Sequence, residues 1–229
     1  MTDPDSVIRA ALEPERGAPC LTCSFQAEDM VVLDVVRRLC PQIPVLFLET
    51  GYHFAETYVY RDRMAQAWNL NLVNLRAESS VAEQESAFGI LYQTQPDRCC
   101  QIRKVEPLFR GLAQYEVWFT GLRREQSPTR ANLQPMEDHR LPSGKPILKV
   151  SPLADWTSKD VWSYMAVNEI PHLPLYDQGY ASIGCQPCTR AVPDGQEIRA
   201  GRWWWELPEQ KECGLHVVDG RLVPTKSLR

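Results

Sequence analysis

The stretch PCLTCSFQAEDMVVLDVVRRLC, residues 19–40, decides the class of the fold, because a strand pattern passes directly into a helix pattern. Residues 19–25 are apolar or rich in Thr and Cys, which is typical of a buried strand. Residues 27–40 repeat apolar side chains at helical spacing and carry two acidic residues in the first turn, as an amphipathic helix does. The stretch therefore predicts a strand followed by a helix that packs back on it.

The same alternation continues along the chain. Residues 45–48 form an apolar strand pattern, residues 54–68 a helix pattern and residues 70–75 a third strand pattern. Strands separated by helices of this length run parallel, so we expect an α/β fold with a doubly wound, mostly parallel sheet. The remaining elements expected are helices at 6–12, at 100–112 and after a cap at Thr157 or Ser158, and strands at 117–120 and 147–150.

Composition narrows the class of protein. The chain has 229 residues, of which 44% are hydrophobic, and a net charge of −4 that does not favour nucleic acid. No apolar run approaches the roughly 20 residues that cross a bilayer, and the acidic N-terminus carries no signal segment, so we expect a cytoplasmic protein. We expect one α/β domain over residues 1–195 and a loop-rich C-terminal segment over 196–229 that carries a mobile tail.

Two cysteine pairs indicate a metal centre. Cys99 and Cys100 are adjacent, and Cys185 and Cys188 form a second pair. Four thiolates hold either an iron–sulfur cluster or a structural zinc ion. Because side chains that are neighbours in sequence must diverge, an adjacent pair suits the separated corners of a cluster better than one small ion. A cluster is therefore the preferred interpretation.

Polar residues follow the predicted strands, where ligands of parallel sheets bind. Ser24 to Asp29 offers a hydroxyl and a helix start, and Glu49 to Gly51 is a turn whose glycine lets backbone approach a ligand. Each could be an ordinary turn, but together they predict a nucleotide pocket. Gly121 to Arg130 contains three arginines and is either an anion-binding loop or a solvated basic loop.

The C-terminal part contains a further cysteine, Cys213, with Lys211 and His216 close by in sequence. Neighbouring cations favour the thiolate that a nucleophile requires, although an incidental exposed cysteine fits the composition equally well. Upstream, Arg199 and Arg202 precede three tryptophans, for which packing of a terminal element is preferred over a stacking role.

In this order these motifs resemble the assimilatory sulfonucleotide reductases, and in particular the iron–sulfur branch that acts on adenylyl sulfate (APS). The resemblance extends from Ser24 to His216. Its most specific parts are Cys99-Cys-Gln-Ile-Arg-Lys104-Val-Glu-Pro107, Gly184-Cys-Gln-Pro-Cys188 and Lys211-Glu-Cys-Gly-Leu-His216. The resemblance implies a Rossmann-like fold of the adenine nucleotide alpha-hydrolase type.

The resemblance also implies roles for individual residues. A [4Fe-4S] cluster would be bound by Cys99, Cys100, Cys185 and Cys188. The catalytic residues would be Cys213, Lys104 and His216. The substrate would be held by Ser24, Leu48, Thr50, Gly51, Arg130, Arg199 and Arg202.

By the same resemblance, Cys213 would attack the sulfur of APS, and thioredoxin or a glutaredoxin-like donor would release sulfite from the S-sulfocysteine. The closest rival is reduction of the 3′-phosphorylated substrate (PAPS) by the same chemistry. More distant rivals are an ATP pyrophosphatase of similar fold and a non-enzymatic redox sensor or zinc-binding module. The sequence leaves a homo-oligomer open.

Overall fold

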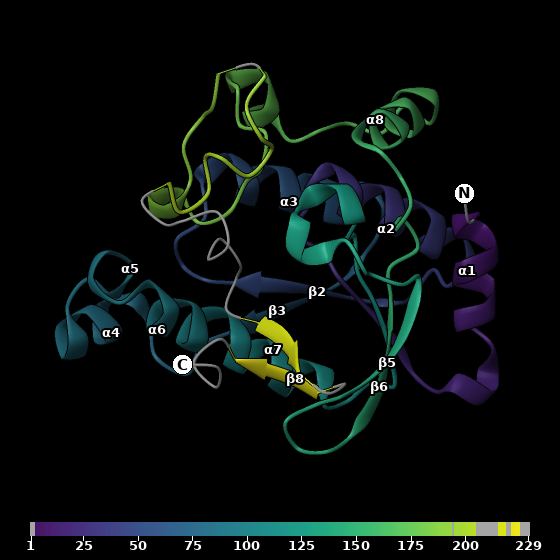
Figure 1. The fold of residues 1–229 in the computed structure, drawn as a ribbon, viewed down its shortest axis with the longest axis horizontal. Coiled ribbons are helices and arrows are strands. Elements are labelled where there is room, and N and C mark those ends of the chain that lie inside the picture. Colours follow the sequence, from purple (N-terminus) through teal and green to yellow (C-terminus); the bar gives the residue numbers. More distant parts are fainter. Residues whose placement is uncertain (1–2, 194, 205–214, 219–220, 225–229) are drawn as a thin grey trace.

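A computed structural model describes residues 3–193, 195–204, 215–218 and 221–224 (Figure 1). Its centre is an eight-stranded sheet in the order β3-β2-β1-β4-β6-β5-β8-β7. Five neighbouring strands run parallel: β3 (Asn71–Arg76), β2 (Pro44–Glu49), β1 (Pro19–Thr22), β4 (Val117–Phe119) and β6 (Pro146–Val150). The predicted α/β class with a mostly parallel sheet is thus confirmed.

The middle of the sheet is apolar because both of its faces are covered. Leu21 of β1 lies opposite Val45 of β2 on one side and Phe119 of β4 on the other, and all three are buried. Strands buried on both faces read as continuous apolar runs rather than as an alternating pattern. This is why the short runs around residues 20, 46 and 118 were recognisable as strands.

Helices cover both faces of the sheet. One face packs against α1 (Pro4–Ala11), α2 (Ala27–Leu39), α3 (Ala55–Ala67) and α8 (Ser158–Val167), and the other against α7 (Glu106–Leu112) (Figure 1). The doubly wound arrangement is therefore also confirmed. No helix among the described residues is long and apolar enough to cross a membrane.

The helix expected at 100–112 is longer and is interrupted by a π-helical segment. It consists of α6 (Pro96–Cys100), a π segment (Gln101–Val105) and α7. The backbone N–H of Glu106 bonds to the carbonyl of Gln101, five residues back. Pro107 follows and has no N–H to donate to the carbonyl of Arg103, so the α-helical bonding pattern could not have continued unbroken here. Segments of this kind often lie at functional sites.

Several elements were not predicted. They are α4 (Val81–Phe88), α5 (Leu91–Thr94), β5 (Met136–Arg140), β7 (Leu215–Val218), β8 (Arg221–Pro224) and short 3₁₀ turns at 14–16, 124–126, 128–130, 174–178 and 186–188. β5 pairs antiparallel with β6, and the β7–β8 hairpin joins β5 through Arg221 opposite Arg140. Buried Leu222 packs with Leu141 and Ile147, so the hairpin extends the sheet within the segment expected to be loop-rich. The division at residue 195 stays a prediction.

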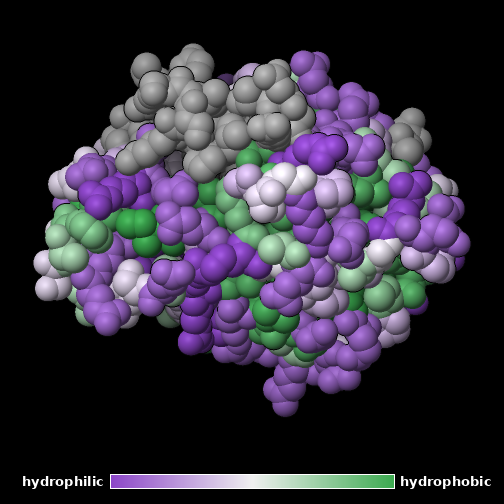
Figure 2. All heavy atoms as spheres, turned by 90° about the horizontal axis from the view of Figure 1, so that it is seen from below, coloured by the Kyte–Doolittle hydropathy of each residue, from purple (hydrophilic) through white to green (hydrophobic). Residues whose placement is uncertain are grey.

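The surface seen in Figure 2 is mostly hydrophilic, with apolar residues in small separate patches. One such patch lies at the left of that view. Among the exposed apolar side chains of the chain are Phe88, at the end of α4, and Ile90, just before α5. The guanidinium of Arg98 lies 4.1 Å from the centre of the Phe88 ring and covers part of it. Hydrophilic and apolar residues are thus interspersed on this face, in agreement with the modest net charge of the chain.

Candidate functional site

The four paired cysteines line one cavity. Cys99 and Cys100 lie at the end of α6, Cys185 immediately precedes the 3₁₀ turn Gln186–Cys188, and Cys188 is the last residue of that turn. All four are buried, and all are free thiols. Tyr52, Tyr92, Pro96, Pro187, Arg103 and Lys104 complete the wall. The structure thus brings together the two pairs that the sequence analysis joined.

Burial and cations act on these thiols in opposite directions. Burial raises the pKa of Cys99, and the neighbouring Cys185 raises it further, whereas Lys104 and Arg103 lower it. Burial likewise raises the pKa of Cys188 to about 12, against the opposing effect of Lys104 and Arg202. Thiols held in this way ionise readily only when a positive group binds them, which is the usual coupling between thiolate ligands and a metal.

The chemistry of the side chains around this cavity can be compared with that of known metal centres. Among the described residues there is no group of three or more His, Cys, Asp or Glu side chains already arranged around one metal position. Nevertheless four buried thiols face one cavity, with cations beside them. Iron–sulfur clusters are held by four Cys thiolates spread over their corners. The donor set, four cysteine thiols facing one cavity, is the one that such a cluster uses.

Trp203 lies beside Lys104, predicted to be catalytic, and beside Arg199 and Arg202, predicted to bind the substrate. Its ring, almost fully buried, packs with the cysteines. The charged groups of Lys104, Arg199 and Arg202 lie 5.6, 5.8 and 4.5 Å from its centre. Its backbone N–H donates to the Cys188 carbonyl at 3.1 Å. Buried packing was expected for the tryptophans, but this contact with three cations was not predicted.

The predicted nucleotide turn is attached to the cysteine loop. The backbone N–H of Gln186 donates to the carbonyl of Tyr52 at 2.7 Å, and His53 forms a β-bridge with Cys185. The Cys185 thiol donates to the hydroxyl of the fully buried Thr50 at 3.4 Å. A change in the position of this turn must therefore move one of the paired cysteines.

Gly51 and Leu48 complete this turn. Gly51 has φ +76°, and a Cβ there would lie 2.6 Å from Val81 Cγ2, so only glycine fits. The Leu48 carbonyl accepts a hydrogen bond from His53 Nε2 at 2.8 Å. Burial lowers the pKa of His53, and because a carbonyl can only accept a hydrogen bond, the ring nitrogen that faces Leu48 carries a proton.

Arg103 ties the π segment to the same turn. This buried side chain donates from Nε to the Thr50 carbonyl at 2.5 Å and from Nη1 to the Ser79 carbonyl and to Gln84 Oε1, both at 3.2 Å. Sequence reasoning missed it, because an arginine beside Lys104 in a helical pattern reads as a solvated charge. Its only available signal was its place between Cys100 and Lys104.

Asp29 joins the other two predicted loops. Its carboxylate accepts hydrogen bonds from the Ser24 backbone N–H and hydroxyl, both at 2.6 Å, and from the Gly121 N–H at 3.2 Å. Burial raises its pKa to about 6 even though these hydrogen bonds oppose the shift. Gln26 donates to the Ser24 hydroxyl and accepts from the Ile183 N–H, so the Ser24 loop also contacts the segment before Cys185.

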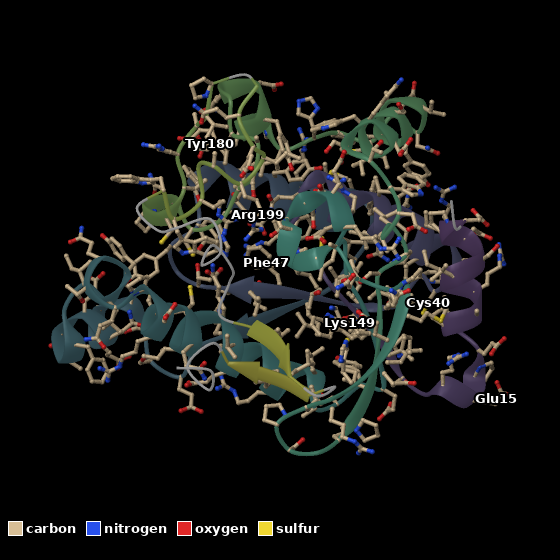
Figure 3. All side chains as sticks on the ribbon, viewed as in Figure 1. Glu15, Cys40, Phe47, Lys149, Tyr180 and Arg199 are labelled. Atoms are coloured by element: carbon tan, nitrogen blue, oxygen red, sulfur yellow. The ribbon has the colours of Figure 1, made fainter. Side chains whose placement is uncertain are left out.

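One predicted residue, Arg130, lies outside this cluster, and two others cannot be placed from the described residues. Arg130 lies on the 3₁₀ turn Pro128–Arg130, donates to Gln126 in its own loop and does not line the cysteine cavity. Cys213 lies outside the described residues, and of His216 only the backbone, in β7, is described. Cys40 is not one of the paired cysteines. In Figure 3 it lies beside α1, far from the labelled Arg199.

Comparisons with known proteins agree with this geometry. Residues 18–191 match the phosphoadenosine phosphosulfate reductase domain. The "Adenosine 5′-phosphosulfate reductase" of Halalkalibacterium halodurans is 44% identical over 92% of this chain and 90% of its own length. The protein of the same name from Streptomyces coelicolor is 43% identical over 92% and 86%. The "Phosphoadenosine 5′-phosphosulfate reductase" of Gloeobacter violaceus is 41% identical over 93% and 88%.

Two solved structures show the same fold. Phosphoadenylyl-sulfate (PAPS) reductase from Candida auris has a TM-score of 0.67 and 26% identity, over 83% of this chain and 90% of that chain. FMN adenylyltransferase from Candida glabrata has a TM-score of 0.57 at 16% identity, over 83% of this chain and 63% of that chain, and shares the fold alone.

Proposed function

Because this chain belongs to the phosphoadenosine phosphosulfate reductase family, we propose that it reduces adenosine 5′-phosphosulfate to sulfite and AMP. One observation carries the proposal: Trp203 packs with Cys100, Cys185 and Cys188, and the cations Lys104, Arg199 and Arg202 surround its ring. A cavity built in this way suits an anionic substrate beside a thiolate-bound group. Several relatives that are more than 40% identical are named for this reaction.

The proposed cofactor is a [4Fe-4S] cluster held by Cys99, Cys100, Cys185 and Cys188. When bound, it would supply a fixed charge distribution and a clasp between α6 and the cysteine loop, with no need to change oxidation state. The chain's own part is to hold four thiols in one cavity and to place cations beside them, which favours their ionised form.

The substrate is assigned to the carboxyl ends of the strands, where parallel sheets bind ligands. Lys104, Arg199 and Arg202 would offset the charge of the phosphosulfate, with Arg130 assisting from its loop. The adenosine would be held by Ser24, the Leu48 backbone, Thr50 and Gly51. The support for this assignment is that Asp29 and Arg103 fix the two turns that carry these residues.

The chemistry follows from charge. The Cys213 thiolate attacks the sulfur atom of the substrate, an S–S bond forms, and the S–O bond to phosphate breaks, so that the electron pair leaves with AMP. Cations lower the repulsion between the thiolate and the anionic target and stabilise charge on the leaving oxygen. His216, three residues after Cys213, is proposed to assist this step. The product on the protein is an S-sulfocysteine.

Release of sulfite requires a dithiol, which we assign to thioredoxin or a glutaredoxin-like donor. A donor thiolate attacks Cys213 Sγ, sulfite departs with the electron pair, and the second donor thiol resolves the mixed disulfide. The donor is thereby oxidised by two electrons and Cys213 returns as a thiol. Such a cycle suits the reducing cytoplasm, where cysteines remain thiols.

A second candidate is reduction of the 3′-phosphorylated substrate, because the Gloeobacter violaceus relative and the Candida auris structure are named as reductases of that compound.

Two measurements test these proposals. Anaerobically purified protein should be coloured and contain iron and sulfide. Sulfite release should be measured with each nucleotide alone and with both in competition, with thioredoxin as the reductant. Preference for the unphosphorylated nucleotide supports the proposal, whereas preference for the 3′-phosphorylated one selects the second candidate. A zinc-loaded colourless protein would overturn the cofactor assignment.

A further inference from the structure

A second pocket lies beside the predicted nucleotide turn and shares Arg103 with the cysteine cavity. Its volume is about 380 Å³, within the range of pockets that hold small molecules. Its wall is formed at the ends of β2 and β3 and at the start of α4, and it includes Glu49, Gly51, Arg76, Ser79, Ser80 and Arg103. Ligands of parallel sheets bind at this end of the strands. Apart from Gly51, the proposed reaction uses none of these residues.

Arg103 brings a buried positive charge to this pocket. The residue is 5% exposed, and its Nε and Nη1 are occupied by the three acceptors described above. Within the described part of the chain, its Nη2 makes no hydrogen bond. This atom lies on the side of Gly51, where a Cβ would be 3.6 Å from it. A buried donor without an acceptor destabilises the fold, so this amino group requires an acceptor inside the pocket.

Arg76, the last residue of β3, supplies a second guanidinium. The residue is exposed, and its charged group makes no hydrogen bond or ion pair with the residues that the structure describes. Ser79 and Ser80 add two hydroxyls to the same wall. The Ser80 hydroxyl accepts from the Glu83 N–H at 3.2 Å, which leaves its own O–H able to donate. The pocket therefore offers donors from two cations and two hydroxyls.

The one carboxylate among these wall residues, Glu49, is already compensated. It accepts hydrogen bonds from the Tyr58 hydroxyl at 2.6 Å and from the Gly51 N–H at 2.9 Å. Arg61 Nη1 lies 3.3 Å from its second oxygen, so the charge of Glu49 is balanced outside the pair formed by Arg76 and Arg103. These two arginines therefore set the sign of the charge in the pocket.

We propose that this pocket binds a tetrahedral oxyanion, a phosphate or sulfate group, between Arg76 and Arg103. The forked donors of arginine match the oxygen atoms of such groups. A carboxylate has only two oxygens and cannot serve two guanidiniums and two hydroxyls at once, whereas a tetrahedral anion can. Because Arg103 also holds the Thr50 carbonyl, the bound anion stabilises the link between the nucleotide turn and the π segment.

The oxyanion has two sources. It is either an inorganic ion or a second phosphate carried by a nucleotide whose adenosine lies at the turn of Gly51. Only the nucleotide source rests on the proposed function, since an inorganic ion needs nothing but the pocket.

The first test is titration calorimetry of anaerobic protein with inorganic phosphate at low ionic strength. Arg76→Met removes one of the two guanidiniums at an exposed position, so the fold should be retained. Phosphate binding is expected to weaken about tenfold or more, because a charge-assisted hydrogen bond contributes at least that factor. Arg63→Met is the matched control, since it removes the same charge from an exposed position on α3 and should bind phosphate as wild type does.

The second test locates the anion, because the cations near Trp203 also attract phosphate. Crystals are soaked in selenate, a tetrahedral anion whose anomalous signal marks its position. The signal is expected between Arg76 and Arg103 in wild type and should be absent there in Arg76→Met.

Titrations with AMP and with adenosine 3′,5′-bisphosphate distinguish the two sources. If the bisphosphate binds wild type more tightly than AMP does, and Arg76→Met removes that advantage, the anion belongs to a nucleotide. If Arg76→Met weakens the binding of inorganic phosphate alone, the anion is free. Either result supports an oxyanion pocket.

Two results would overturn the inference. One is equal phosphate binding by wild type, Arg76→Met and Arg63→Met, and the other is a selenate signal confined to the cations near Trp203. Failure of the proposed reaction would appear instead as wild-type protein that releases no sulfite from adenosine 5′-phosphosulfate. Because the binding tests do not measure turnover, the two failures are distinguishable.

Discussion

The substitution Arg103→Met tests whether one buried guanidinium holds the predicted nucleotide turn against the cysteine helix. Its three hydrogen bonds reach the Thr50 carbonyl, the Ser79 carbonyl and Gln84 Oε1. Methionine fills much of the space but donates nothing. Three buried acceptors would therefore lose their donor, and burial limits the access of water to them.

The expected loss follows from these contacts. A hydrogen bond from a charged donor contributes about 1.5–3 kcal/mol, and an orphaned buried acceptor costs about 1–3 kcal/mol. At the low end of this range, three bonds give a loss of about 4–5 kcal/mol. For a chain of this size the melting temperature should then fall by roughly 8–20 °C. A loss of about 4–5 kcal/mol is a large part of the free energy of unfolding of an ordinary domain.

The assay is denaturant unfolding of anaerobic protein, with Arg110→Met as the control. Arg110 lies on α7 and donates to the Arg76 carbonyl and Glu78, but its side chain is 47% exposed, whereas Arg103 is 5% exposed. Exposed pairs of this kind contribute about 0–1 kcal/mol. If the two variants differ by less than about 1 kcal/mol, the structural role assigned here to Arg103 is wrong.

Three further predictions concern residues around the site. The pKa of Asp29 is raised to about 6 from 3.8, so this group stabilises the fold at low pH and the contribution is lost as the pH rises through 6. In denaturant unfolding, this group should make wild type about 1 kcal/mol more stable at pH 5 than at pH 7, and Asp29→Asn should lack that difference. Parallel pH profiles for wild type and variant would contradict the prediction. In Gly184→Ala the new Cβ would lie 2.3 Å from Arg202 Nη2, so sulfite release should slow about tenfold, and an unchanged rate would remove Arg202 from the site. Trp203→Leu should cost about 3 kcal/mol in thermal unfolding, because a large buried ring and its contacts with three cations are lost; a cost below 1 kcal/mol would refute its central packing role.

The parallel part of the fold was predictable because its strands are buried on both faces and its helices alternate with them. The strand expected at 19–25 is shorter and ends at Thr22, and Phe25 has a positive φ that no pattern of apolar residues reveals. α4 carries a readable start, the capping box at Ser80 and Glu83, but it lacks a strong apolar period. The β7–β8 hairpin depends on a contact with β5 far away in sequence.

The site was predictable where residue type alone specifies the chemistry. The pairing of the four cysteines was predicted in this way, whereas the three cations near Trp203 were predicted only from the family resemblance. Arg103 and Asp29 were not, because each acts through partners distant in sequence that only the fold brings close. A charged residue in a helix is usually solvated, so burial had to be seen before these residues could be recognised.

The most direct test of the account is a single turnover without reductant. Anaerobic protein is mixed with sulfur-labelled adenosine 5′-phosphosulfate, digested and examined by mass spectrometry, while AMP is quantified. The account predicts one AMP per added SO₃ group, located on the peptide that contains Cys213, and neither product with Cys213→Ser. AMP release without a protein-bound SO₃ group, or an adduct that persists in the Cys213→Ser variant, would contradict it.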